Sequence, residues 1–191
     1  MPFHHIFCLR KFFSRPEKYD YIFSLGDGCF GANALQLAGL RKFAGPFDLL
    51  CGLDLNKCVK LLLNNFNNFA PNVNWCAEYD KNPESYDVRI KRIIDCLTSG
   101  RRVLLVHAGN TATLADARRA LDSLQAKFGN NIHMILVLFG PDIKKCKLYR
   151  INPDLYYVRT LSWDKLDDCD YKKSIRMFIR ALAGIGLSNA S

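Results

Sequence analysis

The sequence lacks any pair of cysteines at C-x-x-C spacing and any cluster of cysteine and histidine at the spacing of zinc ligands. Its eight cysteines stand singly, at positions 8, 29, 51, 58, 76, 96, 146 and 169. In a chain of 191 residues without a recognisable signal peptide, this distribution predicts reduced thiols and a cytoplasmic location. We therefore expect no structural zinc, no other bound metal and no cofactor.

Acidic residues are scarce relative to basic ones, 18 against 27, which gives a net charge of +9. Such a charge favours an acidic partner or an acidic membrane surface. The basic residues are scattered, however, and no arginine-rich or aromatic-interleaved segment typical of RNA-binding proteins is present. Nucleic acid is therefore not the expected partner, and a solvated basic surface is the simpler interpretation.

Long apolar runs are missing as well. Residues 1–19 mix apolar side chains with basic ones, and their apolar run is too short to span a bilayer. We interpret this stretch as an N-terminal extension packed on the domain; the alternatives are an anchor at a membrane surface and an organelle-targeting segment. No internal repeat or linker follows, and 49% of the residues are hydrophobic. Residues 20–191 are therefore predicted to form one domain with a sizeable core.

The chain is organised around a strand, a glycine turn and a helix. Tyr21-Ile22-Phe23 is a short run of strand formers, Gly26-Asp27-Gly28 permits a tight turn, and residues 30–40 form a mostly apolar helix. Cys29 stands at the start of that helix. The free amides and the positive end of the helix dipole there stabilise a thiolate and the oxyanion that forms when a thiolate attacks a carbonyl. Cys29 is thus a candidate nucleophile; the alternative is an inert, buried thiol.

Three motifs carry a resemblance to a known family. They are Ser24-Leu25-Gly26, the cysteine at position 29, and Pro46-Phe47-Asp48 after the helix. Together they resemble an uncharacterised family described as putative papain-like cysteine peptidases, and the Tyr-x-x-Arg pattern from Tyr86 is similar as well. The resemblance implies a cysteine-dependent peptidase or hydrolase. This chain departs from it in two places: Leu49 replaces a usual tryptophan, and residues 73–79 lack an expected histidine.

The remainder of the chain predicts a three-layer α/β domain with a mainly parallel sheet. Helical spacing covers residues 55–66, 86–97, 114–128 and 175–182, and strands are predicted at 102–107, 132–139 and 155–158. The strand-helix-strand order over residues 102–139 predicts a parallel βαβ unit. The arginines of residues 86–97 are expected on a solvated face. The alternative fold is a papain-like α+β arrangement of a helical half and a barrel half.

A cysteine nucleophile needs a base and usually a group that orients the base. His4 and His5 belong to the extension and His133 begins a strand, so His107, at the end of a strand, is the candidate base. Asp142 is the first candidate to orient it, with Asp48 and Asp27 as alternatives; Asp48 could instead brace the turn after Pro46. Sites in parallel sheets form outside the carboxyl ends of the strands, where one crevice could hold Cys29, His107 and Asp142.

Two main functions follow from these residues. The first is a cysteine-dependent hydrolase or acyl transferase that acts on an amide, ester or thioester of a peptide, small molecule or acyl group. The second is a catalytically inactive relative that binds a ligand or partner, which the missing histidine favours. A weaker alternative takes Gly26-x-Gly28-x-x-Gly31 as a dinucleotide fingerprint, with Asp48 as its acidic residue. A serine hydrolase is excluded, because Gly28 occupies the serine position of a Gly-Asp-Ser motif.

Overall fold

The computed structural model describes residues 19–26, 28–48, 50, 52–67, 69, 85–140, 146–161 and 168–184, without the side chains of residues 161, 168–170 and 184. These ranges contain five strands and five helices. The strands are β1 (Tyr21–Ser24), β2 (Val103–Ala108), β3 (Ile132–Gly140), β4 (Lys147–Arg150) and β5 (Leu155–Leu161). The helices are α1 (Phe30–Leu37), α2 (Leu55–Leu63), α3 (Tyr86–Thr98), α4 (Leu114–Phe128) and α5 (Asp168–Gly184).

The strands form one sheet in the order β1-β2-β3-β5-β4. The first four are parallel, with Ser24 paired to Val106 and His107 paired to Leu136. Only the edge strand β4 runs antiparallel, against β5. The predicted α/β class and the parallel β2-α4-β3 unit are therefore confirmed. Because β1, β2, β3 and β5 share one direction, their carboxyl ends lie along the same edge of the sheet.

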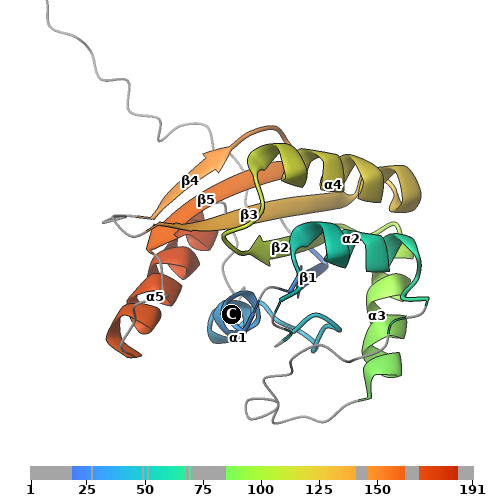
Figure 1. Ribbon diagram of the computed structural model, residues 1–191, viewed down its shortest axis with the longest axis horizontal. Coiled ribbons are helices and arrows are strands. Elements are labelled where there is room, and N and C mark those ends of the chain that lie inside the picture. The colour runs from blue at the N-terminus through green and yellow to red at the C-terminus, as the bar shows by residue number, and fades with distance from the viewer. Residues whose placement is uncertain are drawn as a thin grey trace, which may run out of the picture.

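Helices cover both faces of this sheet, as the layers in Figure 1 show. One core lies on the face covered by α2, α3 and α4, and the other lies on the face covered by α1 and α5. Alternate residues of β2 divide between the two cores: Val103 and Leu105 belong to the first, and Leu104, Val106 and Ala108 to the second. This alternation determines which helices each side chain of the sheet meets.

Three local details differ from the prediction. The short strand β4 was missed, because three of its four residues are exposed, two are charged, and they carry little apolar pattern. Helix α1 ends at Leu37 instead of Leu40, since Gly39 adopts a left-handed φ of 65° that stops it. In α3 the expectation of a solvated arginine face is wrong for Arg89, which is 0% exposed. The buried stripe of that helix is Arg89, Ile93, Cys96 and Leu97.

Within the ranges given above, no helix combines the length and the apolar character that a membrane crossing requires.

Candidate active site

The turn between β1 and α1 depends on two glycines. Gly26 and Gly28 have φ values of 58° and 102°, which side chains with a Cβ rarely adopt. The Leu25 amide continues the parallel ladder by donating to the Val106 carbonyl at 2.8 Å, and the Gly28 amide donates to the Leu50 carbonyl at 2.9 Å. A Cβ on Gly26 would lie only 2.9 Å from the Cys58 sulfur. The sequence Gly-x-Gly thus shapes a turn packed against the segment before α2.

Cys29 follows this turn as the N-cap residue of α1. Its φ and ψ are −80° and −15°, and its carbonyl accepts the first bond of the helix, from the Asn33 amide at 2.9 Å. The thiol forms no side-chain cap and is partly exposed, whereas Phe30 and Gly31 beside it are buried. Cys29 therefore stands at the positive end of α1, at the carboxyl edge of the sheet.

Gly31 lets α1 approach β1 closely. A Cβ at this position would lie 2.6 Å from the Ser24 Oγ and 3.8 Å from the Val106 carbonyl oxygen. The Ser24 hydroxyl is buried and has no hydrogen-bond partner among the described residues. The third glycine of the motif therefore allows α1 to pack closely against β1. This packing determines how far Cys29 lies from the end of β1.

His107 is the penultimate residue of β2 and is 0% exposed. Its Nδ1 lies 2.6 Å from the Leu25 carbonyl oxygen. Because a carbonyl only accepts, Nδ1 carries the proton in this bond, and in the neutral ring Nε2 holds the lone pair. By strand alternation the ring lies on the face of Val103 and Leu105.

The turn at residues 25–28 thus connects α1, on one side of the sheet, with His107, on the other side. Helix α1 packs in the core that contains Val106 and Ala108. His107 shares the other face and reaches the turn through its bond to Leu25. Sequence reasoning placed both residues at one edge of the sheet, but the strand parity that separates their faces follows only from the register.

Asp48 braces the turn after α1. It is 2% exposed, and its Oδ2 accepts from the Gly45 amide and from the Arg41 guanidinium, both at 2.7 Å. This is the structural role that the sequence left open for it, and Arg41 is the partner that sequence reasoning missed. Its signal was present, because an arginine stands seven residues before the aspartate on the far side of Gly45-Pro46. Asp142 and Asp27 lie outside the described residues, as do Leu49 and residues 73–79.

The other described thiols are buried or have a raised pKa. Cys58 is buried, with its sulfur 3.7 Å from the carbonyl oxygens of Leu25 and Leu53. Burial raises the pKa of Cys96, with a smaller contribution from Asp95, and burial raises the pKa of Cys146 to about 11. All four are free thiols. Of these four, Cys29 alone begins a helix.

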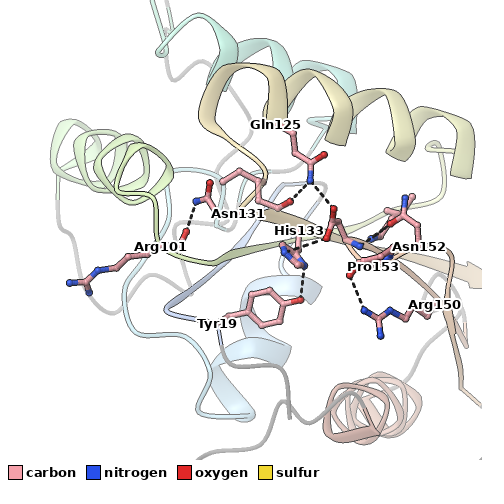
Figure 2. A network of polar contacts seen from close by, with 11 residues as sticks. Tyr19, Arg101, Gln125, Asn131, His133, Arg150, Asn152 and Pro153 are labelled. Atoms are coloured by element: carbon pink, nitrogen blue, oxygen red, sulfur yellow. Dashed lines mark hydrogen bonds and ion pairs between the residues drawn. The ribbon is translucent and has the colours of Figure 1, made fainter. Parts of the chain in front are cut away.

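His133 lies near the start of β3, at the amino ends of the parallel strands, within the network drawn in Figure 2. Its Nδ1 lies 3.1 Å from the Tyr19 hydroxyl, and its Nε2 lies 3.5 Å from a carboxylate oxygen of Asp154. Gln125 donates to the other oxygen of Asp154 at 3.3 Å. This histidine therefore links β3 to Tyr19, two residues before β1, and through Asp154 to α4, and it is remote from the carboxyl edge.

The dinucleotide interpretation is incomplete in this fold, because its acidic residue belongs at the end of the second strand. The second strand, β2, ends at Ala108, whereas Asp48 lies in the turn that it braces. In the part of the chain that the structure describes, no three side chains of histidine, cysteine, aspartate or glutamate gather as a group that could hold a metal ion.

Comparison with known proteins supports the family resemblance over part of the chain. Residues 20–84 match the model of a family described as "Putative papain-like cysteine peptidase". The matched stretch contains Cys29 and Asp48 and ends before β2. Searches of curated proteins and of solved structures return no match. The resemblance predicted from the sequence is therefore confirmed for the strand-turn-helix that carries Cys29 and for the segment that follows it.

Proposed function

We propose that this protein is a cysteine-dependent hydrolase or acyl transferase whose nucleophile is the Cys29 thiolate. The observation that carries the proposal is the position of Cys29: a partly exposed thiol at the N-terminus of α1, at the carboxyl edge of a parallel sheet. The matched family is described as "Putative papain-like cysteine peptidase", and Cys29 lies within the match. A thiol in this position is favoured as its thiolate by the helix dipole.

The reaction would proceed through an acyl-enzyme. The Cys29 sulfur attacks the carbonyl carbon of an amide, ester or thioester, and a carbon–sulfur bond forms as the carbonyl oxygen becomes an oxyanion. The amides of the first turn of α1 precede the first intrahelical bond, that of Asn33, and are the donors for this oxyanion. The leaving group departs with a proton, and water or another acceptor then releases the acyl group from sulfur.

His107 is the proposed base. Its Nδ1–H donates to the Leu25 carbonyl, which holds the tautomer whose Nε2 accepts a proton. In the mechanism Nε2 receives the thiol proton across the end of β1 and later returns it to the leaving group. Because Nδ1 is bonded to Leu25 and Nε2 faces the thiol in this mechanism, Asp142 would act on the charged ring through its negative charge, whereas the contacts of Asp48 with Arg41 and Gly45 fit a bracing role better.

A second function is favoured by the complete burial of His107 and by its place on the opposite face from α1. In a binding module, His107 would serve to fix the turn at Leu25, and Cys29 would line a site for a ligand or partner without reacting. Both functions use the same turn, and they differ in the acidity of the Cys29 thiol.

The deciding experiment is the pH dependence of alkylation by iodoacetamide, followed at each cysteine by peptide mass spectrometry. In wild-type protein we expect an apparent pKa of Cys29 well below the ~8.5 of a free thiol. His107→Gln is the informative variant, because a glutamine amide can still donate to the Leu25 carbonyl but cannot accept a proton at neutral pH. The proposed pair requires that the pKa of Cys29 rise in this variant while its thermal unfolding remains cooperative.

Cys146 provides an internal control in the same samples, since its raised pKa keeps it slow. If Cys29 titrates like an ordinary thiol in both proteins, the hydrolase proposal fails and the binding module replaces it. A lowered pKa of Cys29 that is the same in both proteins would retain the thiolate and remove His107 from the mechanism.

A further inference from the structure

A groove that the candidate active site does not use lies beside the edge strand β1. It has a volume of about 360 Å³, is more open than enclosed, and is lined by Tyr21, Phe43 and five residues of α3: Val88, Lys91, Arg92, Asp95 and Cys96. None of these residues contributes to the glycine turn, to the first turn of α1 or to the His107 contact. The volume falls within the range of about 300 to 1,000 Å³ that is usual for small-molecule sites.

Aromatic rings form one wall of this groove. The Phe43 side chain is 41% exposed, although it is large and apolar, and its ring centre lies 6.5 Å from that of Tyr21. The Arg92 guanidinium lies over the Phe43 ring, 4.9 Å from its centre. Arg92 is held there by a bond from its Nη1 to the Ala44 carbonyl at 3.3 Å. The wall therefore consists of two rings tilted by 37° with a guanidinium over one of them, so it is apolar and cationic at the same time.

Positive charge surrounds the wall. Lys42 and Arg101 stand over the Tyr21 ring, at 5.7 Å and 5.9 Å from its centre. Lys91 lines the groove with a side chain that is 77% exposed, and it pairs with Asp95 at 2.6 Å. Among the lining residues, two cations, Lys91 and Arg92, stand beside one carboxylate, Asp95. An anion is the ligand that this charge distribution favours.

We propose that the Tyr21–Phe43 groove binds a nucleotide, either free or as one unit of a single strand. The flat base packs against the aromatic wall and the Arg92 plane, and the phosphate lies at Lys91 and Arg92. Inorganic phosphate or an acidic peptide would use the cations but leave the aromatic wall uncovered. The combination of exposed ring, stacked guanidinium and flanking lysines is the recognition chemistry of a base joined to a phosphate.

The test is a titration of the unmodified full-length protein by isothermal calorimetry with AMP, adenosine and inorganic phosphate, each up to about 10 mM, since weak sites bind in the millimolar range. Anisotropy of a fluorescein-labelled oligothymidylate distinguishes a free nucleotide from a strand. We expect AMP to bind at least about tenfold more tightly than adenosine or phosphate, because ring and charge contribute together. Binding should weaken as salt is raised.

Two variants locate the site, each with a matched control elsewhere. Phe43→Leu removes an exposed ring beside the edge strand β1. Tyr149→Leu removes another exposed ring, on β4, which is the edge strand farthest from β1. Lys91→Gln removes one charge from the groove, and Lys172→Gln removes one from an exposed position of α5. Each groove variant should weaken AMP binding about fivefold or more, as expected for loss of a stacking or phosphate contact, and the controls should not.

Three results would overturn the proposal. The first is no heat of binding with AMP or the oligonucleotide. The second is equal affinity for AMP and phosphate with no effect of Phe43→Leu, which would mean only general attraction to anions. The third is an equal loss in the control variants. Since none of these substitutions alters Cys29 or His107, the outcome is independent of the alkylation experiment.

Discussion

The ring of His107 and the carbonyl of Leu25 are joined by a hydrogen bond of 2.6 Å between residues 82 positions apart in the sequence. This bond extends the pairing of β1 with β2 by one side chain beyond the last strand residue, Ser24. Both groups are buried and out of reach of water, so this bond supplies the hydrogen-bond partner that water cannot supply. The glycine turn that presents Cys29 is therefore fixed to the sheet from the face opposite α1.

Replacement of His107 by leucine should destabilise the fold even if Cys29 has no catalytic role. The Leu25 carbonyl would lose its ring donor and keep only the weak Cys58 thiol at 3.7 Å, and a poorly satisfied buried acceptor costs about 1 to 3 kcal/mol. Urea unfolding followed by circular dichroism measures the loss. His107→Gln should recover part of it. Equal stabilities of His107→Leu and wild type would show that this bond does not hold the turn.

Gly31→Ala should be costly for a reason unrelated to helix propensity, which alanine improves. The new methyl group would lie 2.6 Å from the Ser24 Oγ, and overpacking of this kind costs about 1 to 3 kcal/mol. The Ser24→Ala background removes that oxygen and leaves the Ser24 Cβ at 3.4 Å. We expect the double variant to be more stable than Gly31→Ala alone. Additive effects in this cycle would contradict the proposed clash.

Asp48→Ala should destabilise the protein far more than Asp95→Ala. Asp48 is buried against Arg41, so its loss leaves an uncompensated charge and an unpaired amide at Gly45, at about 3 to 5 kcal/mol. The Lys91–Asp95 pair is exposed and should contribute less than about 1 kcal/mol. Chemical denaturation of the two variants measures both values. Similar losses would argue against a bracing role for Asp48.

Cys146 should make the protein less stable at high pH. Burial raises the pKa of its thiol to about 11, whereas in the unfolded chain this group titrates at an ordinary value near ~8.5. Between these values the unfolded state has released the proton that the folded state keeps, so the free energy of unfolding falls as pH rises. Denaturant melts from pH 8 to about 11 should show this fall, and Cys146→Ala should reduce it.

Short stretches of the sequence predict the individual strands, turns and helices of this protein. Tyr21-Ile22-Phe23 predicts β1 and the glycines predict the turn. Asp54, directly before the apolar stripe of α2, caps that helix by accepting from the Lys57 amide. The parallel class follows from the order of strands and helices. These features need only periodicity, backbone freedom and capping, which act over a few residues.

Tertiary structure decided the features that depend on contacts between segments far apart in the sequence. The register of β1 and β2 brings the His107 ring to the Leu25 carbonyl. The alternation of side chains along β2 places His107 on the face opposite α1. Packing of α3 buries Arg89, although its charge predicted solvent exposure. The groove joins Tyr21 and Phe43 to cations of α3 that no single stretch of sequence holds together. Sequence patterns carry no such information, because contact between residues far apart in the chain depends on the whole fold.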